Sequence, residues 1–334
     1  MNINNFYEVL KDEPAYRLKQ AQKLLFGDLI DNWNKASNLP LALREKLNLE
    51  CPIDISSKIL AARDKKSFKA LITLSDGTRI ETVLMRHKEG RETVCVSSQV
   101  GCPLGCAFCA TGASGFTRNL TKNEIVEQAL LWARYLKNNF KSKITNVVFM
   151  GMGEPFLNYD QVMSAVRVLN EPDGLHIGAR HISISTVGLA DGIKRLANEK
   201  IQVNLAVSLH SANDKIRSDL MPINKKYSIV QLLRAVDQYI EKTNRQVMFE
   251  YMLMKNVNDS DEAAERLAAI MNKPLYVVNL MNYNETSVFH AVDEKTFKNF
   301  EKILEKRKIK VTSRYRFGSD ISAACGQLAA RKKQ

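Results

Sequence analysis

The chain has 334 residues, of which 45% are hydrophobic and 25% are charged, and this balance excludes a disordered or fibrous protein. No apolar run approaches the roughly 20 residues that span a membrane, and the polar start is unlike a secretory signal. We therefore expect a cytoplasmic protein without a membrane partner. The net charge of +13, spread along the chain, favours a polyanionic partner such as RNA or DNA, with a merely lysine-rich surface as the alternative.

The first part of the chain predicts two small units. Residues 1–65 suggest short helices, one of them starting after Pro40. This region carries no catalytic constellation, and its basic residues suit a helical accessory domain that binds RNA. Residues 66–100 predict strands, because two apolar runs flank the Asp-Gly pair at 76–77 and a third run lies near 93–96. We expect a β-hairpin extension there.

Residues 101–334 alternate between strand and helix patterns. Helix starts carry capping signals, such as Thr121 followed by Glu124. The expected strands lie at 146–150, 181–185, 203–208, 247–253, 276–280 and 310–313. About six such strand–helix units indicate parallel strands with crossover helices. Because six units cannot close an eight-fold barrel, we expect an α/β fold with a partial (βα)6 barrel, and a doubly wound sheet is the alternative.

Three cysteines stand at the start of this region. Cys102, Cys106 and Cys109 have the spacing C-x3-C-x2-C, and thiolates bind iron–sulfur clusters, zinc or copper. A structural zinc site or an ordinary cubane cluster requires four ligands, but the sequence has no second group of closely spaced cysteines. Three close cysteines would leave one iron of a cluster open to a substrate or cofactor. Packing cysteines are the alternative, although three thiols so close together make poor core filler.

Polar residues follow several of the expected strands, where the site of a parallel sheet lies. Glycines let a ligand approach the backbone closely, a carboxylate can accept from an amine or hydroxyl, and the other side chains offer neutral hydrogen bonds. Singly each residue is typical of a turn or cap, but together they suit a zwitterionic, ribose-bearing ligand beside a cluster. These residues are Gly153, Glu154, Ser185, Ser208, Leu209, His210 and Asn284.

The remaining candidates are ambiguous from residue type alone. Cys95 lies on an expected strand and Cys325 lies in a stretch of small residues, so either thiol suits a core position. Glu81 on the hairpin suits a solvated strand face. Cys51 has no evident partner, and we interpret it as structural.

Longer segments around these residues form a consistent set. They are Cys95–Cys102, Gly115–Thr121, Gly151–Pro155, Ser208–His210, Met221–Lys225 and Ala324–Leu328. In sequence and order these segments resemble the RlmN/Cfr family of radical S-adenosylmethionine RNA adenine methyltransferases. The resemblance covers essentially the whole chain.

The resemblance implies a cofactor set and a role for each candidate. It implies one [4Fe–4S] cluster on Cys102, Cys106 and Cys109, and two S-adenosylmethionine molecules per turnover. The pocket for S-adenosylmethionine would consist of Gly153, Glu154, Ser185, Ser208, Leu209, His210 and Asn284. Cys325 would accept the methyl group and carry it to adenine as a covalent adduct, and Glu81 would accept the ring proton. Cys95 would then release the RNA by forming a disulfide with Cys325.

Two branches of the family differ in the carbon that is methylated. Pro155 and the segment Gly115–Arg118 favour the RlmN branch, which methylates C2 of adenine. Residues 313–318 lean toward the Cfr-like branch, which methylates C8 and confers antibiotic resistance, and Ser322 and Asn282 depart from the usual pattern. We expect C2 methylation, with C8 as the alternative.

The resemblance also implies partners. The substrates would be an adenosine in the peptidyl-transferase region of 23S rRNA and one just 3′ of a tRNA anticodon. Flavodoxin or ferredoxin would supply electrons to a monomeric enzyme. A remote alternative from another functional class is a non-catalytic iron–sulfur RNA-binding protein. Such a protein would need the three closely spaced cysteines but not Glu81, Cys95 or Cys325.

Overall fold

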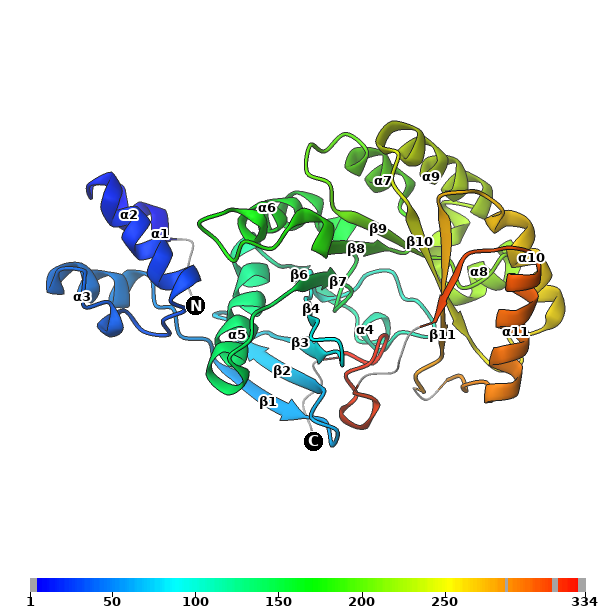
Figure 1. The fold of residues 1–334 in the computed structure, drawn as a ribbon, viewed down its shortest axis with the longest axis horizontal. Helices are drawn as coiled ribbons and strands as arrows, with labels where there is room; N and C mark the ends of the chain where they lie inside the picture. Colours follow the sequence, from blue (N-terminus) through cyan, green and yellow to red (C-terminus); the bar gives the residue numbers. More distant parts are fainter. Residues whose placement is uncertain (1–4, 286–287, 314–317, 330–334) are drawn as a thin grey trace.

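The structure is a computed structural model that describes residues 5–285, 288–313 and 318–329 (Figure 1). Its strands are β1 (Ser57–Ala61), β2 (Ser67–Thr73), β3 (Arg79–Arg86), β4 (Glu92–Cys95), β5 (Gln99–Gly101), β6 (Phe116–Asn119), β7 (Asn146–Phe149), β8 (Ile182–Thr186), β9 (Asn204–Ser208), β10 (Val247–Leu253), β11 (Tyr276–Asn282) and β12 (Val311–Ser313). Its α-helices are α1 (Phe6–Leu10), α2 (Ala15–Gln22), α3 (Leu41–Glu50), α4 (Ala110–Ala113), α5 (Lys122–Phe140), α6 (Tyr159–Asn170), α7 (Ala190–Leu196), α8 (Asp214–Leu220), α9 (Ile229–Thr243), α10 (Asp261–Met271) and α11 (Glu294–Lys306). Within the described ranges, no helix has the length and apolar character needed to cross a membrane.

Helices α1 to α3 form a small unit at one end of the molecule (Figure 1). Trp33 is fully buried in this unit, and its indole N–H donates to the carbonyl oxygen of Cys51 at 2.8 Å. The unit is fastened to α5 by the buried Arg134 guanidinium, which donates to the carbonyl oxygens of Ile30 and Ile53. These contacts satisfy main-chain acceptors that would otherwise be buried without partners.

The strand β1 was not predicted. The expectation of helices throughout residues 1–65 is wrong at 57–61, where β1 pairs antiparallel with β2. Most side chains of this edge strand are exposed or half-exposed, so it lacks the apolar alternation that marks a strand. The hairpin β2–β3 is as predicted, with its turn at 76–77, and it extends the main sheet next to β4. The domain boundaries at 65 and 100 remain a prediction.

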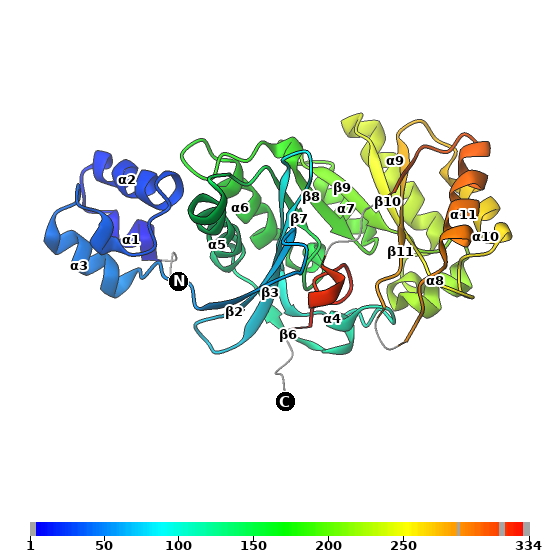
Figure 2. The same cartoon turned by 60° about the horizontal axis from the view of Figure 1, so that its bottom comes forward.

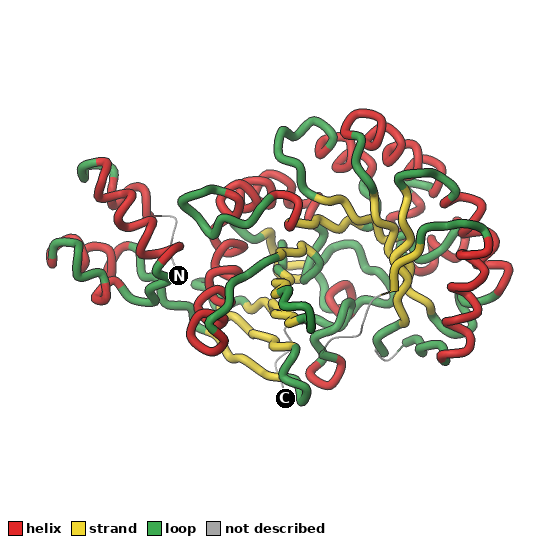
Figure 3. Tube along the Cα trace, in the orientation of Figure 1, coloured by secondary structure: helices red, strands yellow, loops and turns green. Residues whose placement is uncertain are grey.

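The main sheet has ten strands in the order β1-β2-β3-β4-β7-β8-β9-β10-β11-β12. From β4 to β12 each neighbouring pair is parallel. Figure 3 shows these strands as one curved band with the long helices outside it. The two edge strands β1 and β12 are not neighbours, so the barrel is open. The predicted α/β fold with a partial barrel is therefore confirmed.

The strand register places the main candidates on one face of this sheet. Val83 on β3 lies opposite Cys95 on β4, and Cys95 lies opposite Val148 on β7. Because side chains alternate between faces and directly paired residues share a face, Glu81 shares the face of Cys95. The same reasoning, continued through β8 and β9, adds Ser185 and Ser208.

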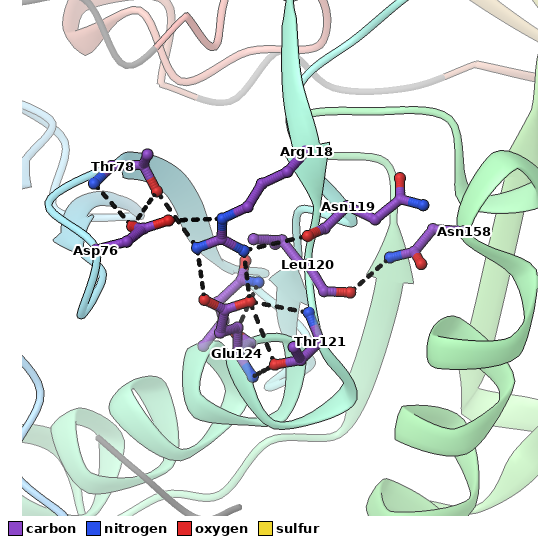
Figure 4. Close-up of polar contacts among 9 residues, drawn as sticks. Asp76, Thr78, Arg118, Asn119, Leu120, Thr121, Glu124 and Asn158 are labelled. Atoms are coloured by element: carbon purple, nitrogen blue, oxygen red, sulfur yellow. Dashed lines mark hydrogen bonds and ion pairs between the residues drawn. The ribbon is translucent and has the colours of Figure 1, made fainter.

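Arg118 on β6 fixes the small β5–β6 sheet to the rest of the molecule (Figure 4). Its guanidinium lies 2.6 Å from Asp76 Oδ2 in the hairpin turn and 2.8 Å from Glu124 Oε1 on α5. Glu124 also completes the predicted capping box with Thr121. The Arg118 guanidinium holds the pKa of the Asp76 carboxyl well below its usual range. Strand β6 is thus held in place beside the loop that starts at Cys102.

Candidate active site

A cavity of about 150 Å³ lies at the carboxyl ends of β7 to β11. This is where the site of a parallel sheet is expected, because the loops at that edge converge. The predicted residues that line the cavity are Cys102, Cys106, Cys109, Gly153, Glu154, Ser185, Ser208, His210 and Cys325. Among the described residues, the predicted members that do not line it are Glu81, Cys95, Leu209 and Asn284.

The cysteine loop is held in shape by main-chain contacts. Cys102 N donates to Gly115 O at 2.8 Å, and Ala107 N donates to Leu220 O at 2.9 Å. Gly101 has a φ of +80°, and a Cβ there would lie 2.0 Å from Gly115 O, so only glycine fits. The loop therefore turns sharply and directs all three cysteines to one cavity.

The three cysteines of the loop place soft thiol donors at one cavity. Burial raises the pKa of Cys102 to about 11 and also raises that of Cys106, so metal binding must displace protons from these thiols. Across the described ranges, no group of three or more His, Cys, Asp or Glu side chains is arranged around a single ion. Soft thiol donors around one cavity are of the type that binds iron–sulfur clusters.

Glu154 is a buried acceptor at the end of β7. Its carboxylate accepts from Phe156 N at 3.0 Å and from Val187 N at 2.9 Å. Burial raises the pKa of Glu154 to about 7. Gly153 before it has a φ of +99°, and a Cβ there would lie 2.5 Å from Gln99 Cβ. The tight turn thus leaves a carboxylate in the cavity that can pair with a cationic ligand group.

His210 is fixed at the end of β9. Its Nδ1 accepts from Met252 N at 3.2 Å, and its ring packs edge-on against Phe108 with centroids 4.8 Å apart. Burial lowers the pKa of His210 to about 3, so the ring is neutral at physiological pH. Leu209 is fully buried in the core, and its N–H donates to Glu250 O at 3.0 Å. Leu209 therefore holds the strand end, and its neighbours Ser208 and His210 face the cavity.

Figure 2 shows the C-terminal segment, in red, beside α4 and the hairpin β2–β3. Cys325 lies in an exposed turn of this segment and not in the core. Ala110 N donates to Gly326 O at 2.8 Å, and the Thr111 hydroxyl donates to Leu328 O at 2.5 Å. These contacts bring Cys325 to the cavity of the three cysteines.

Asn284 supports the same turn. Its Nδ2 donates to Cys325 O at 3.3 Å, whereas its Oδ1 is buried without a hydrogen-bond partner in the described part of the chain. A buried acceptor left without a donor costs free energy, and a ligand with an N–H or O–H group would satisfy it. This geometry fits a bound cofactor next to the turn.

Glu81 and Cys95 lie on the inner face but outside the cavity lining. Glu81 Oε1 is 2.9 Å from Lys69 Nζ, and Glu81 Oε2 accepts from Ala329 N at 2.9 Å. Cys95 is buried on β4, and both Cys95 and Cys325 are thiols here. The structure thus brings Glu81 to the C-terminal segment that carries Cys325.

Asn282 and Ser322, which depart from the family pattern, both make hydrogen bonds in the structure. Asn282 pairs with Val292 across the loop, donating to Val292 O at 2.7 Å and accepting from Val292 N at 3.0 Å. The carbonyl oxygen of Ser322 accepts from Lys69 Nζ at 3.2 Å. Residues 314–317, which lean toward the C8 branch, lie outside the described residues.

Sequence reasoning missed three charged residues near the site. Arg217 on α8 is buried and donates to the main chain at the ends of β8 and β9. Glu250 on β10 lines the cavity and accepts from Asn279 Nδ2 at 2.5 Å. Lys69 is paired with Glu81. A charged residue inside an otherwise apolar strand was the available signal for Glu250 and Lys69, because buried charges are rare unless paired.

Comparisons with known proteins agree with this geometry. A model of the radical SAM superfamily matches residues 96–268, just over half of the chain. Dictyoglomus thermophilum has a protein named "Probable dual-specificity RNA methyltransferase RlmN" that is 44% identical over 98% of this chain and 95% of its own length. The chain belongs to the RlmN family. A relative of the same name from Carboxydothermus hydrogenoformans is 44% identical over 96% of this chain and 93% of its own.

A solved structure of a radical SAM methyltransferase has the same fold. A radical SAM methyltransferase from Sphaerobacter thermophilus aligns with a TM-score of 0.94 and 43% identity, covering 99% of this chain and 98% of that chain. The RlmN-family chain described here is a radical SAM RNA methyltransferase. Membership of the radical SAM superfamily implies a [4Fe–4S] cluster and S-adenosylmethionine, and the three thiols that line the cavity fit such a cluster.

Proposed function

We propose that this protein methylates C2 of an adenosine in the peptidyl-transferase region of 23S rRNA and of the adenosine just 3′ of a tRNA anticodon. The proposal rests on the RlmN name of its relatives and on the residues around the cavity. An electron donor such as flavodoxin or ferredoxin would serve a monomeric enzyme in the cytoplasm, where these RNAs are found.

The cavity would hold the cofactors. Cys102, Cys106 and Cys109 would bind the cluster, and Glu154 would pair with the amino group of S-adenosylmethionine. The other predicted pocket residues would hold the rest of that ligand, namely Gly153, Ser185, Ser208, Leu209, His210 and Asn284. Of the two S-adenosylmethionine molecules used per turnover, one would supply the methyl group to Cys325. The other, with the cluster, would supply the radical chemistry that the electron-poor C2 carbon requires because it is not a nucleophile.

The protein would contribute three residues to the transfer itself. Cys325 would carry the methyl group and form a covalent link to adenine, and Glu81 would accept the ring proton. The thiolate of Cys95 would attack the Cys325 sulfur, release the RNA and form a disulfide. One observation supports the role of Cys325 best. Cys325 lines the same cavity as Cys102, Cys106 and Cys109, although it is remote from them in sequence.

A cysteine substitution tests the carrier role. Cys325→Ala should keep its iron content and give no methylated adenosine, measured by mass spectrometry of RNA nucleosides. Cys51→Ala is the matched control, since Cys51 is buried in the N-terminal unit away from the cavity, and it should methylate RNA as the unchanged protein does. Methylated adenosine from Cys325→Ala would refute the carrier role.

A second substitution tests the resolving role. Cys95→Ala should leave RNA attached to Cys325, because no thiolate is available to attack the carrier sulfur. The attached RNA would appear as a slowly migrating band on a denaturing protein gel and would vanish after nuclease digestion. Free RNA with normal methylation would show that Cys95 has no such part.

A further inference from the structure

Lys69 is a charged residue in the middle of an apolar strand. It lies on β2 diagonally across from Glu81 on β3, and the register places both side chains on the inner face. Their side chains are 11% and 9% exposed, and Lys69 Nζ lies 2.9 Å from Glu81 Oε1. The pair is therefore a buried ion pair and not a surface contact.

The same two side chains hold the C-terminal segment on both sides of Cys325. Before Cys325, Lys69 Nζ donates to Ser322 O at 3.2 Å. After it, Ala329 N donates to Glu81 Oε2 at 2.9 Å. The Lys69–Glu81 pair thus connects the hairpin to each end of the turn that carries the thiol.

Folding stability alone does not account for this pair. Removing two charges from water costs several kcal/mol per ion, and replacing a buried pair with packed apolar residues is often neutral or stabilising. A lysine that makes one ion pair and one main-chain contact also restricts geometry, because it fixes a carboxylate and a carbonyl oxygen around one nitrogen atom. The pair therefore costs folding stability, but it fixes the position of Glu81 relative to the Cys325 turn.

We propose that Lys69 is a positioning residue that keeps the Cys325 turn in register with the Glu81 carboxylate. This inference rests on the proposed function, in which Cys325 carries the methyl group and Glu81 accepts the ring proton. Each oxygen of Glu81 has lone pairs beyond those used by Lys69 and Ala329, so the carboxylate can accept a proton while both contacts persist. Without Lys69, the Cys325 turn and the Glu81 carboxylate would lose the nitrogen atom that contacts both of them.

The consequence is a loss of coupling between cofactor consumption and RNA methylation. Lys69→Met keeps the length of the side chain and removes the ammonium group. It should still bind the cluster, methylate Cys325 and cleave S-adenosylmethionine. The amount of 5′-deoxyadenosine formed per methylated adenosine should rise about tenfold, as small misplacements of reacting groups produce. Lys69→Arg keeps a charged donor and should restore most of the coupling.

The ratio of these two products separates positioning from general damage. A variant that is merely partly unfolded loses both products together and leaves the ratio unchanged. Lys58→Met is the matched control, because Lys58 is an exposed lysine on the adjacent strand β1, and its ratio should equal that of the unchanged protein. If Lys69→Met and Lys69→Arg both fold and keep the normal ratio, the inference is wrong and the proposed function stands. If the unchanged protein makes no methylated adenosine, the proposed function fails and the inference with it.

Discussion

Arg217 offers a quantitative test of how the cofactor pocket is built. Its guanidinium donates to Val187 O at 2.7 Å and to the carbonyl oxygens of Ser208 and Leu209 at 3.2 Å each. It also donates to Asn224 Oδ1 at 2.6 Å. One side chain therefore joins the carboxyl ends of β8 and β9, where the predicted pocket residues lie. Arg217→Met would remove all four contacts while filling much of the same space.

The expected cost follows from two opposing effects. Each buried carbonyl oxygen left without a donor costs about 1–3 kcal/mol. Burial lowers the pKa of Arg217 to about 10, so removing this charge returns about 3 kcal/mol. Three acceptors lose this donor, namely Val187 O, Ser208 O and Asn224 Oδ1, whereas Leu209 O still accepts from Ser211 N. At about 1–3 kcal/mol each, they outweigh the returned energy, and we expect a net destabilisation of about 3 kcal/mol and at most about 6 kcal/mol. Because the loss falls on the strand ends, affinity for S-adenosylmethionine should fall at least about tenfold.

Calorimetric titration of the cluster-loaded protein with S-adenosylmethionine measures this effect, and thermal unfolding reports the stability. Arg266→Met is the matched control, because Arg266 is an exposed arginine that pairs with Glu262 on its own helix. The control should change stability by less than about 1 kcal/mol and leave the affinity unchanged. If Arg217→Met binds S-adenosylmethionine as tightly as the unchanged protein, the pocket does not depend on this network.

Two further predictions concern the cysteine loop and His210. Gly101→Ala should lower the iron bound per chain by more than half, because its Cβ would lie 2.0 Å from a carbonyl oxygen of the loop. Gly27→Ala, whose Cβ would meet only a side chain at 3.7 Å, should load normally; equal iron in both would contradict the packing argument. His210→Asn should make unfolding less acid-sensitive, since the lowered pKa of about 3 means that His210 supports folding above about pH 6.5 and loses that support as the pH falls toward 3. Parallel plots of melting temperature against pH for both proteins would refute this.

The long helices and the parallel strands were predictable because the sequence patterns that mark them lie within each element. Capping residues marked the starts of α5 and α9, and apolar runs marked the parallel strands. The short elements β1, β5, β6 and α8 were missed. Helix α8 has only seven residues, DKIRSDL, and five of them are polar, so its sequence carries no clear apolar period. Such elements form because of tertiary contacts and not because of their own pattern.

The site was predictable where residue type alone restricts the chemistry. Three close cysteines indicate a metal centre in any fold, whereas Cys325 gained a role only from the family resemblance. The roles of Arg217 and Lys69 could not be assigned because their partners lie on other elements of the fold, which only the packed structure brings together. Lys69, for example, contacts Glu81 on the next strand and Ser322 near the C-terminus. Contacts of this kind depend on the packed structure.

We propose that this protein transfers a methyl group to C2 of adenine in RNA. The most direct measurement is mass spectrometry of nucleosides from 23S rRNA and tRNA, prepared from cells lacking an adenine C2 methyltransferase and incubated with the cluster-loaded protein, a reductant and S-adenosylmethionine. We expect 2-methyladenosine in both RNAs and none when the protein is omitted. The appearance of 8-methyladenosine instead, or of no methylated adenosine, would contradict it.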